Sequence, residues 1–405
     1  MWPKSEKQKQ LLEKSQKIAK HISTTSSKHD RDGSFPHEHF AFMRDIGYLA
    51  SAVPESYGGP GYGLTDIILS QFEIATGDGS TALSVGMHHM VIGTESIAKR
   101  WPDSLRERVF GEVVSEGVLL NNIASEPELG SPQGGGRPST ALTPDSNGGW
   151  YLDGRKTWST LAPELTYAIT FAAVNDESGD TARVLQKMSA EGISIEETWD
   201  SMSMRSTGSH DIIFKNVKVE SEDFLFRSNH NHPVNDPIGG AAWFPLMTSA
   251  ANLGVANAAR NYALEFSKSR KPTGASDTIS KIPYVREQIG RLESKLISSK
   301  RNLFSFAEDW ENYPEYHEDL LTEIGVVKTK SIDSAIEITD LAIRIVGGVG
   351  LEKSSVIPSD MGSTAHASDF VYNTTHDKLG NWSTAFSRNF YDDNGFFLKK
   401  GGLEI

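Results

Sequence analysis

Ionisable side chains are concentrated near the C-terminal end of the sequence, in the stretch SDFVYNTTHDKLGNW at residues 368–382. Asp369, Tyr372, His376 and Asp377 fall within nine residues of it. A carboxylate and an imidazole at short spacing are groups that general acid–base catalysis uses near neutral pH. The stretch is therefore either an acid–base cluster or a helix without a catalytic task.

A helix through this stretch would bring several of these groups to one side. His366 and Asp369 are three residues apart, and His376 lies seven residues beyond Asp369, so all three share roughly one helix face. We predict His366 and Asp369 as candidate catalytic residues. A histidine that is simply a satisfied surface or core side chain is the competing interpretation.

Composition limits the chemistry further. The 405 residues include no cysteine, which excludes disulfides, zinc–thiolate sites and thiol nucleophiles. The net charge of −13 argues against a nucleic-acid binder, which needs a basic face for phosphates. No apolar run approaches the roughly 20 residues of a membrane span, so we expect a cytoplasmic protein without a membrane partner, and no metal site is predicted.

The elements that would position these residues change character twice along the chain. Residues 1–116 show helical periodicity, including helices at 64–75 and 80–101 with Thr65 and Ser80 as N-caps. Residues 117–232 hold six short β-type runs separated by turn residues. Residues 233–405 return to helical periodicity, in three stretches of about 27 to 30 residues at 241–270, 284–310 and 320–348. The predicted fold class is α+β, with an N-terminal helical domain, a central β-sandwich or barrel, and a C-terminal four-helix bundle.

Four local motifs follow one another in this framework. They are VPESYGGPGYG at 53–63, ASEPELGS at 124–131, LDGRKTWST at 152–160, and MSMRSTGSHDIIFKNVKV at 202–219. By their order and spacing the chain resembles the acyl-CoA dehydrogenase family of flavoproteins over nearly its whole length. The resemblance implies FAD as the cofactor, with FMN as a possible substitute.

The same resemblance assigns residues to the flavin. It places Ser125 and Ser131 along the flavin, Trp158 against one face of the ring, and the hydroxyl of Thr160 near flavin N5. An aromatic ring can shield the isoalloxazine, and a threonine hydroxyl is small enough to donate a hydrogen bond there. Arg205 of the fourth motif is a candidate substrate contact, although an arginine at this position is often part of the scaffold.

Two C-terminal motifs would complete the cofactor site of another subunit. SRKPTG places Arg270 where the family uses an arginine on the flavin diphosphate of the adjoining subunit, but the family's following Phe-Gly is absent. IVGGVGL places Gly347 and Gly348 near the adenosine part, with a helix C-cap as the alternative use of these glycines. A homotetramer or a homodimer would satisfy both contacts.

The base that the family uses to remove an α-proton is missing. Counting from the glycine turn brings Asn373 to the position of the usual glutamate, and Phe244 stands at the alternative position. Asparagine cannot ionise near neutral pH. Asp369, one helical turn earlier, is a candidate displaced base. His88 comes from the helix that closes the substrate cavity in this family, which makes it a candidate substrate contact.

These features predict an FAD-dependent oxidoreductase of fatty acid metabolism that dehydrogenates an acyl-CoA thioester with a non-standard base. Its redox partner would be electron-transfer flavoprotein. The missing carboxylate and the altered C-terminal segment keep a second hypothesis open: a two-component monooxygenase that receives reduced flavin from a flavin reductase and uses O2. A flavin- or acyl-binding protein without turnover is the third.

Overall fold

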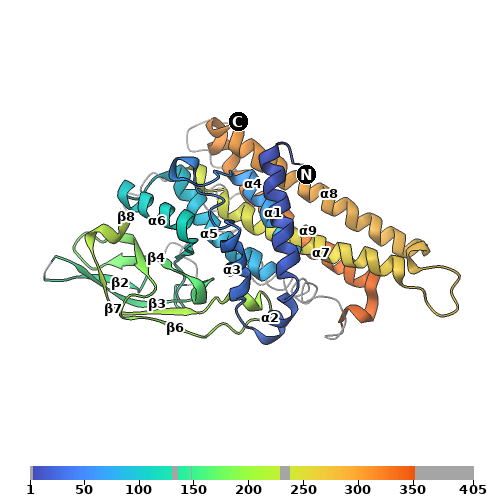
Figure 1. The fold of residues 1–405 in the computed structure, drawn as a ribbon, viewed down its shortest axis with the longest axis horizontal. Helices are drawn as coiled ribbons and strands as arrows, with labels where there is room; N and C mark the ends of the chain where they lie inside the picture. The colour runs from blue at the N-terminus through green and yellow to red at the C-terminus, as the bar shows by residue number, and fades with distance from the viewer. Residues whose placement is uncertain (1–2, 130–135, 147, 229–237, 352–405) are drawn as a thin grey trace, which may run out of the picture.

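The computed structural model describes residues 3–129, 136–146, 148–228 and 238–351 of the chain. Helices come first, a β-sheet follows, and three long helices complete the described part (Figure 1). This order confirms the predicted α+β fold class. No helix within the described ranges is long and apolar enough to cross a membrane.

Six helices precede the sheet. They are α1 (Glu6–Ile22), α2 (Ser26–Asp32), α3 (His37–Asp45), α4 (Leu64–Ile74), α5 (Gly79–Ala98) and α6 (Asp103–Glu116). The predicted caps of α4 and α5 are wrong by two residues. The carboxylate of Asp78 accepts the backbone N–H of Thr81 at 2.7 Å, so α5 begins before Ser80, and Gly63 rather than Thr65 precedes α4.

The central part is one hydrogen-bonded sheet in the order β6-β7-β3-β2-β4-β5-β8, with β1 also paired to β4. Its strands are β1 (Leu120–Ile123), β2 (Ala141–Pro144), β3 (Trp150–Lys156), β4 (Tyr167–Val174), β5 (Thr181–Lys187), β6 (Ile193–Glu196), β7 (Asp211–Val219) and β8 (Phe224–Ser228). The short strands β2 and β8 are absent from the six predicted runs.

The sheet forks at β4. β1 pairs in parallel with the first half of β4, and β2 pairs in parallel with the last two residues of β4. Both strands lie along the same edge of β4, because β5 occupies the other edge. The chain that links β1 to β2 therefore has to leave the sheet where β1 ends. This departure carries the motif that begins at Ala124.

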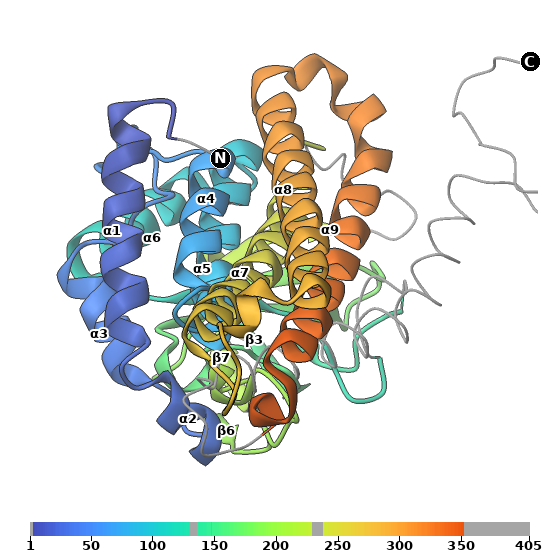
Figure 2. The same cartoon turned by 90° about the vertical axis from the view of Figure 1, so that its right-hand side faces the viewer.

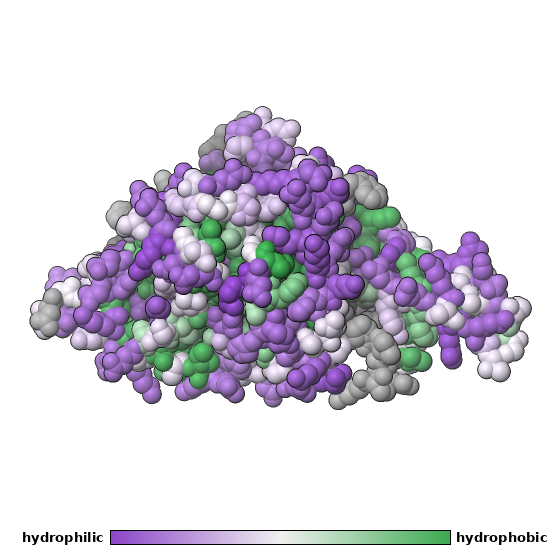
Figure 3. Space-filling view, viewed as in Figure 1, coloured by the Kyte–Doolittle hydropathy of each residue, from purple (hydrophilic) through white to green (hydrophobic). Residues whose placement is uncertain are grey.

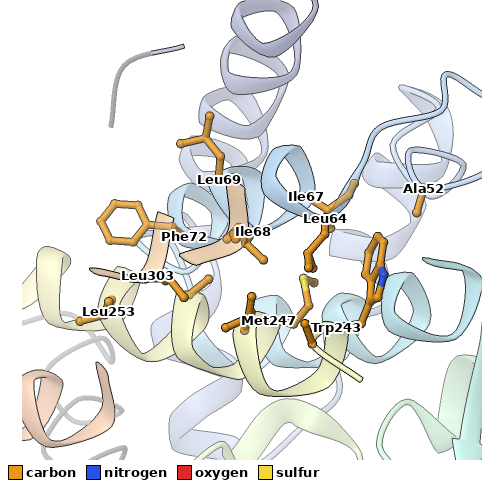
Figure 4. Close-up of a cluster of buried hydrophobic side chains, with 14 of the residues drawn as sticks. Ala52, Leu64, Ile67, Ile68, Leu69, Phe72, Trp243, Met247, Leu253 and Leu303 are labelled. Atoms are coloured by element: carbon orange, nitrogen blue, oxygen red, sulfur yellow. The ribbon is translucent and has the colours of Figure 1, made fainter. Parts of the chain in front are cut away.

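Three long helices follow the sheet: α7 (Trp243–Ser269), α8 (Pro283–Asn312) and α9 (His317–Val346). α8 and α9 lie side by side, with α7 behind them (Figure 2). The fourth helix of the expected bundle would fall in residues 352–405, outside the described residues. Apolar side chains of α4, α7 and α8 form a shared core, with Phe72, Met247 and Leu303 among them (Figure 4). The face seen in Figure 3 is mainly hydrophilic, with small hydrophobic patches.

A face of glycines lets α5 approach its neighbours closely. Gly79, Gly86 and Gly93 recur every seven residues and lie on one side of α5. A Cβ added at Gly93 would stand 2.3 Å from the indole of Trp243, and one at Gly79 would stand 2.8 Å from Val255. α5 and α7 are therefore packed without room for a methyl group at these positions.

Candidate flavin site

The tight turn at residues 157–161, directly after β3, is the centre of the candidate site and is named the flavin turn. Trp158 and Leu161 both have positive φ angles, 56° and 74°, a conformation that costs an ordinary residue about 1–2 kcal/mol. The backbone N–H of Ser159 donates to the carbonyl of His210 at 3.1 Å, and that of Leu161 donates to Thr207 at 3.1 Å. These bonds to the segment before β7 hold the strained turn in place.

The motif at Ala124 lies against the same turn. The backbone N–H of Thr157 donates to the carbonyl of Ser125 at 3.0 Å. From the other side, the amide of Asn121 donates to the carbonyl of Thr160 at 2.9 Å, and the Thr160 hydroxyl lies 2.9 Å from that of Ser209. Ser125, Trp158 and Thr160, which sequence analysis assigned to the flavin, are therefore neighbours in the structure.

A buried ion pair connects the two motifs. Lys156 donates to Glu126 at 2.6 Å, and the two side chains are 0% and 1% exposed. Glu126 also accepts the hydroxyl and backbone N–H of Ser139 and the backbone N–H of Thr140. Burial alone would raise the pKa of Glu126, but hydrogen bonds from Lys156, Ser139 and Thr140 lower it to about 2. The pair is ionised at neutral pH and clamps the chain beside Ser125 to the strand before Trp158.

Sequence analysis did not single out Glu126 or Lys156. Both lie inside motifs that carry the family resemblance, SEPELGS and GRKTWST. Their place in these motifs was the sequence signal that could have marked them. Their pairing joins residues 30 positions apart, and neither residue alone indicates a buried partner.

The exposed surface of this turn suits a flat, polar-edged ring. Trp158 is 53% exposed although hydrogen bonds hold the backbone on its C-terminal side. Ser159 Oγ and Asn121 Oδ1 are buried without a hydrogen-bond partner within the described residues. An isoalloxazine offers an apolar face for the indole and hydrogen-bonding atoms at its rim. These residues fit a flavin; Ser131, the fourth predicted flavin contact, lies outside the described residues.

His88 connects α5 to the sheet. One ring nitrogen lies 2.8 Å from the carbonyl of Leu49, and the other accepts the backbone N–H of Leu120 at 3.3 Å. Complete burial lowers the pKa of His88 to about 4, so the ring is neutral at pH 7. Both nitrogens are engaged with the backbone, and the predicted substrate contact through His88 has no hydrogen-bonding atom left for it.

Phe244, at the alternative position of the missing base, is half-buried in the first turn of α7. The ammonium of Lys328, from α9, lies 5.4 Å from the centre of its ring. A cation therefore stands beside this position. The first acidic residue of α7 is Glu265, about 30 Å farther along the helix axis.

Arg205 is held by the scaffold. Its guanidinium donates to the carbonyls of Asp30 and Ser201, both at 2.7 Å, and lies 3.7 Å from the carboxylate of Asp200. Asp30 belongs to α2, so Arg205 joins the first helical part to the segment beside the flavin turn. This geometry agrees with the scaffold alternative for Arg205.

Arg270 and the glycine turn lie at the other end of the long helices. Arg270 caps α7 and is exposed, about 39 Å along the helix axis from Phe244. Gly347 caps α9, and an added Cβ at Gly347 or Gly348 would meet nothing within 4 Å. The far ends of α7 and α9 point away from the sheet (Figure 1). The predicted contacts of these residues with the cofactor of another subunit stay predictions.

The predicted catalytic residues lie outside the described residues. His366, Asp369 and Asn373 all fall in the range 352–405. Their roles stay predictions.

Comparisons with known proteins show the family of the chain. Residues 5–116, 122–217 and 246–358 match the N-terminal, middle and C-terminal domain models of acyl-CoA dehydrogenase. The Bacillus subtilis (strain 168) protein "Putative acyl-CoA dehydrogenase YdbM" is 35% identical over 351 residues, which are 87% of this chain and 90% of that protein. The chain belongs to the acyl-CoA dehydrogenase family. As a family member it is a flavin-dependent oxidoreductase, which confirms the predicted enzyme class.

Other similar proteins have names that differ from acyl-CoA dehydrogenase. The amino sugar nitrososynthase RubN8 of Streptomyces rubradiris is 30% identical over 268 residues, 62% of this chain and 59% of that protein. Two solved structures share the fold. KijD3, in complex with FMN and a dTDP-sugar, has a TM-score of 0.82 at 21% identity, covering 97% of this chain and 96% of that chain. Dibenzothiophene monooxygenase (TdsC) from Paenibacillus sp. A11-2 has a TM-score of 0.77 at 20% identity, covering 96% and 100%.

Proposed function

We propose that this protein is a flavin-dependent monooxygenase that oxidises a small molecule with O2 and a reduced flavin. The observation that carries the proposal is that the two buried carboxylates beside this turn are already engaged in ion pairs and hydrogen bonds. Within the described residues, Glu126 is paired with Lys156, and Asp211 accepts from Arg155 and Thr157. Removal of an α-proton from an acyl thioester needs an unengaged base of this kind.

The residues of the turn have tasks that suit either flavin. Trp158 would stack on the ring, and Thr160 and Ser125 would hold its polar rim. Bound reduced flavin would supply the two electrons with which one oxygen atom enters the substrate while the other leaves as water. The chain itself would orient the ring through the Lys156–Glu126 pair, and Phe244 would exclude water beside it.

The names of the relatives support this choice. RubN8 is a nitrososynthase, and TdsC and KijD3 have been solved with FMN bound. We therefore expect FMN or FAD to arrive reduced from a flavin reductase, and the substrate to be a small molecule with an oxidisable heteroatom or ring.

Acyl-CoA dehydrogenation is the second candidate, favoured by the 35% identity to YdbM. It would require a base from residues 352–405, where Asp369 is the predicted candidate. Electron-transfer flavoprotein would then be the redox partner.

Two assays on one preparation separate the candidates. Acyl-CoAs of increasing chain length are added anaerobically to the protein loaded with oxidised flavin, and the visible flavin band is followed. The same protein is then supplied with a flavin reductase, NADH and ¹⁸O2, with indole, dibenzothiophene and an amino sugar nucleotide as substrates. The monooxygenase proposal expects ¹⁸O in a product and an unchanged band with every acyl-CoA.

Bleaching of the band together with formation of an enoyl-CoA would overturn the proposal in favour of dehydrogenation. Flavin binding with neither reaction would agree with a binding protein without turnover.

A further inference from the structure

Two histidines and a glutamate meet at the junction of α2 and α3, away from the flavin turn. His29 lies on α2, and Glu38 and His39 lie in the first turn of α3. One ligand atom from each residue lies within 4.8 Å of the other two. His29 and His39 are 6% and 0% exposed, whereas the Glu38 side chain is 46% exposed and leaves a path to solvent.

The outer nitrogen of each histidine is tied to a hydroxyl. Nδ1 of His29 lies 2.8 Å from Oγ of Ser34, and Nδ1 of His39 lies 2.8 Å from Oγ1 of Thr81. Metal-binding histidines are usually oriented in this way, with the ring nitrogen that does not bind the metal held by a hydrogen bond. The two Nε2 atoms are thereby left for the centre of the cluster.

Without a metal ion, the groups that face this centre form hydrogen bonds with one another. Nε2 of His29 lies 2.6 Å from Oε1 of Glu38, and Nε2 of His39 lies 2.8 Å from the hydroxyl of Thr25. Two imidazoles, a carboxylate and a hydroxyl make up a donor set that suits Zn²⁺ and similar divalent ions.

We propose that His29, Glu38 and His39 bind one divalent transition-metal ion per chain, for which Zn²⁺ is the probe. The fourth position would be filled by the Thr25 hydroxyl or by water. The ligand atoms would rearrange from their present separations to about 3.4 Å, the spacing around a tetrahedral ion with bonds of about 2.0–2.1 Å. Metal binding requires Nε2 of His29 to carry no hydrogen, so a hydrogen on that atom would move to Nδ1, beside Ser34, or to solvent.

Such an ion would stabilise the position of α2. α2 is only seven residues long, and its Asp30 carbonyl accepts the Arg205 guanidinium from the segment beside the flavin turn. The inference does not depend on which reaction the flavin site performs.

The test is Zn²⁺ binding to the chelator-treated full-length protein. Isothermal titration with ZnCl2 is carried out on the wild-type protein, on Glu38→Gln and His29→Gln, and on the control His37→Gln. His37 is on the same turn of α3 but pairs with Glu164. We expect one Zn²⁺ per chain in the wild type and control, and an affinity lower by about tenfold or more in the two ligand variants. Thermal unfolding should show a Zn²⁺-dependent rise in Tm only in the wild type and control.

No stoichiometric binding by the wild-type protein, or equal affinity in Glu38→Gln, would overturn the proposal. Glu38 is half-exposed, so we expect its amide variant to fold, and circular dichroism is the control that checks this. An equal loss of affinity in His37→Gln would likewise count against the cluster as the site.

Discussion

Trp158 combines an unfavourable backbone conformation with an exposed indole ring. Its positive φ is unfavourable for a residue with a Cβ, and half of its side chain faces solvent. Conformations of this kind persist where the surrounding hydrogen bonds impose them, and they gather at functional sites.

Replacing Trp158 by glycine should separate the effect of its backbone conformation from the effect of its ring. Glycine tolerates the backbone conformation, so we expect the free energy of unfolding to change by less than about 1 kcal/mol. The loss of the stacking surface should weaken flavin binding by about tenfold or more, measured by fluorescence titration with FMN and FAD. Ile195→Ala, an exposed apolar residue of β6, should leave flavin affinity unchanged. Unaltered affinity in Trp158→Gly would contradict the assigned role.

Lys156 should be among the most sensitive residues of the sheet. Lys156→Met leaves the Glu126 carboxylate buried without its cation, for which we expect a loss of about 3–5 kcal/mol in urea unfolding and weaker flavin binding. Adding Glu126→Gln should restore part of the stability, since no charge then remains unpaired. Lys218→Met, which breaks an exposed pair with Glu220, is the matched control and should cost less than about 1 kcal/mol. A single variant as stable as this control would refute the prediction.

The same pair predicts acid sensitivity. The pKa of Glu126 is lowered from 4.5 to about 2 in the folded protein, so the folded state binds fewer protons than the unfolded state between these values. Its contribution to stability is complete above pH 4.5 and is lost as the pH falls toward 2. Urea unfolding of Glu126→Gln between pH 7 and pH 3 should show a shallower decline than the wild type. Parallel curves would exclude this carboxylate as a source of acid lability.

At the scale of elements, the close contact between α5 and α7 depends on glycines of α5, which have no side chain. Gly93 would bring an added methyl group to 2.3 Å from the Trp243 ring, whereas nothing lies within 4 Å of the same group at Gly111 on α6. Intrinsic helix propensity favours alanine at both positions equally, so only packing distinguishes them.

Gly93→Ala should therefore destabilise the protein by about 1–3 kcal/mol, because an indole cannot move aside in a close-packed core. Gly111→Ala should stabilise it by up to about 1 kcal/mol through helix propensity. Thermal or urea unfolding of the two variants measures the difference. The same change in both would show that α5 and α7 have room to separate.

At the scale of the whole molecule, the long helices expose apolar residues and the predicted cofactor contacts of a second subunit. Tyr284, Ile297 and Val326 of α8 and α9 are each more than half exposed. Arg270 and Gly347, the predicted contacts with a second subunit's cofactor, cap the C-terminal ends of α7 and α9. Both observations suggest that α8 and α9 meet another copy of the chain.

Ile297→Asp should thus dissociate a homodimer or homotetramer, since a buried unpaired carboxylate is unfavourable at an interface. Light scattering after size-exclusion chromatography measures the mass, and flavin affinity should fall with it. Val114→Asp on α6, also an exposed apolar position, should change neither. A wild-type protein that is monomeric at micromolar concentration would refute both the assembly and the role of Arg270.

Sequence alone was sufficient for the order of elements. Helical and strand periodicity are local properties, so the long helices α7, α8 and α9 were predicted to within a few residues. Ser125, Trp158 and Thr160 were assigned through resemblance, and the structure brings them together. Short elements such as β2, with only four residues, carry too little periodicity to be detected.

Only the tertiary structure showed which polar groups are already used in hydrogen bonds and ion pairs. His88 looked available as an isolated imidazole, yet the backbone of two distant segments uses both of its nitrogens. Glu126 and Lys156 looked like ordinary polar residues of a loop and a strand, yet they form the buried clamp of the flavin turn. The cluster of His29, Glu38 and His39 likewise depends on where α2 stops and α3 begins. Hydrogen bonds and ion pairs between remote residues leave no periodic signal in sequence, because they depend on how elements meet rather than on how each one forms.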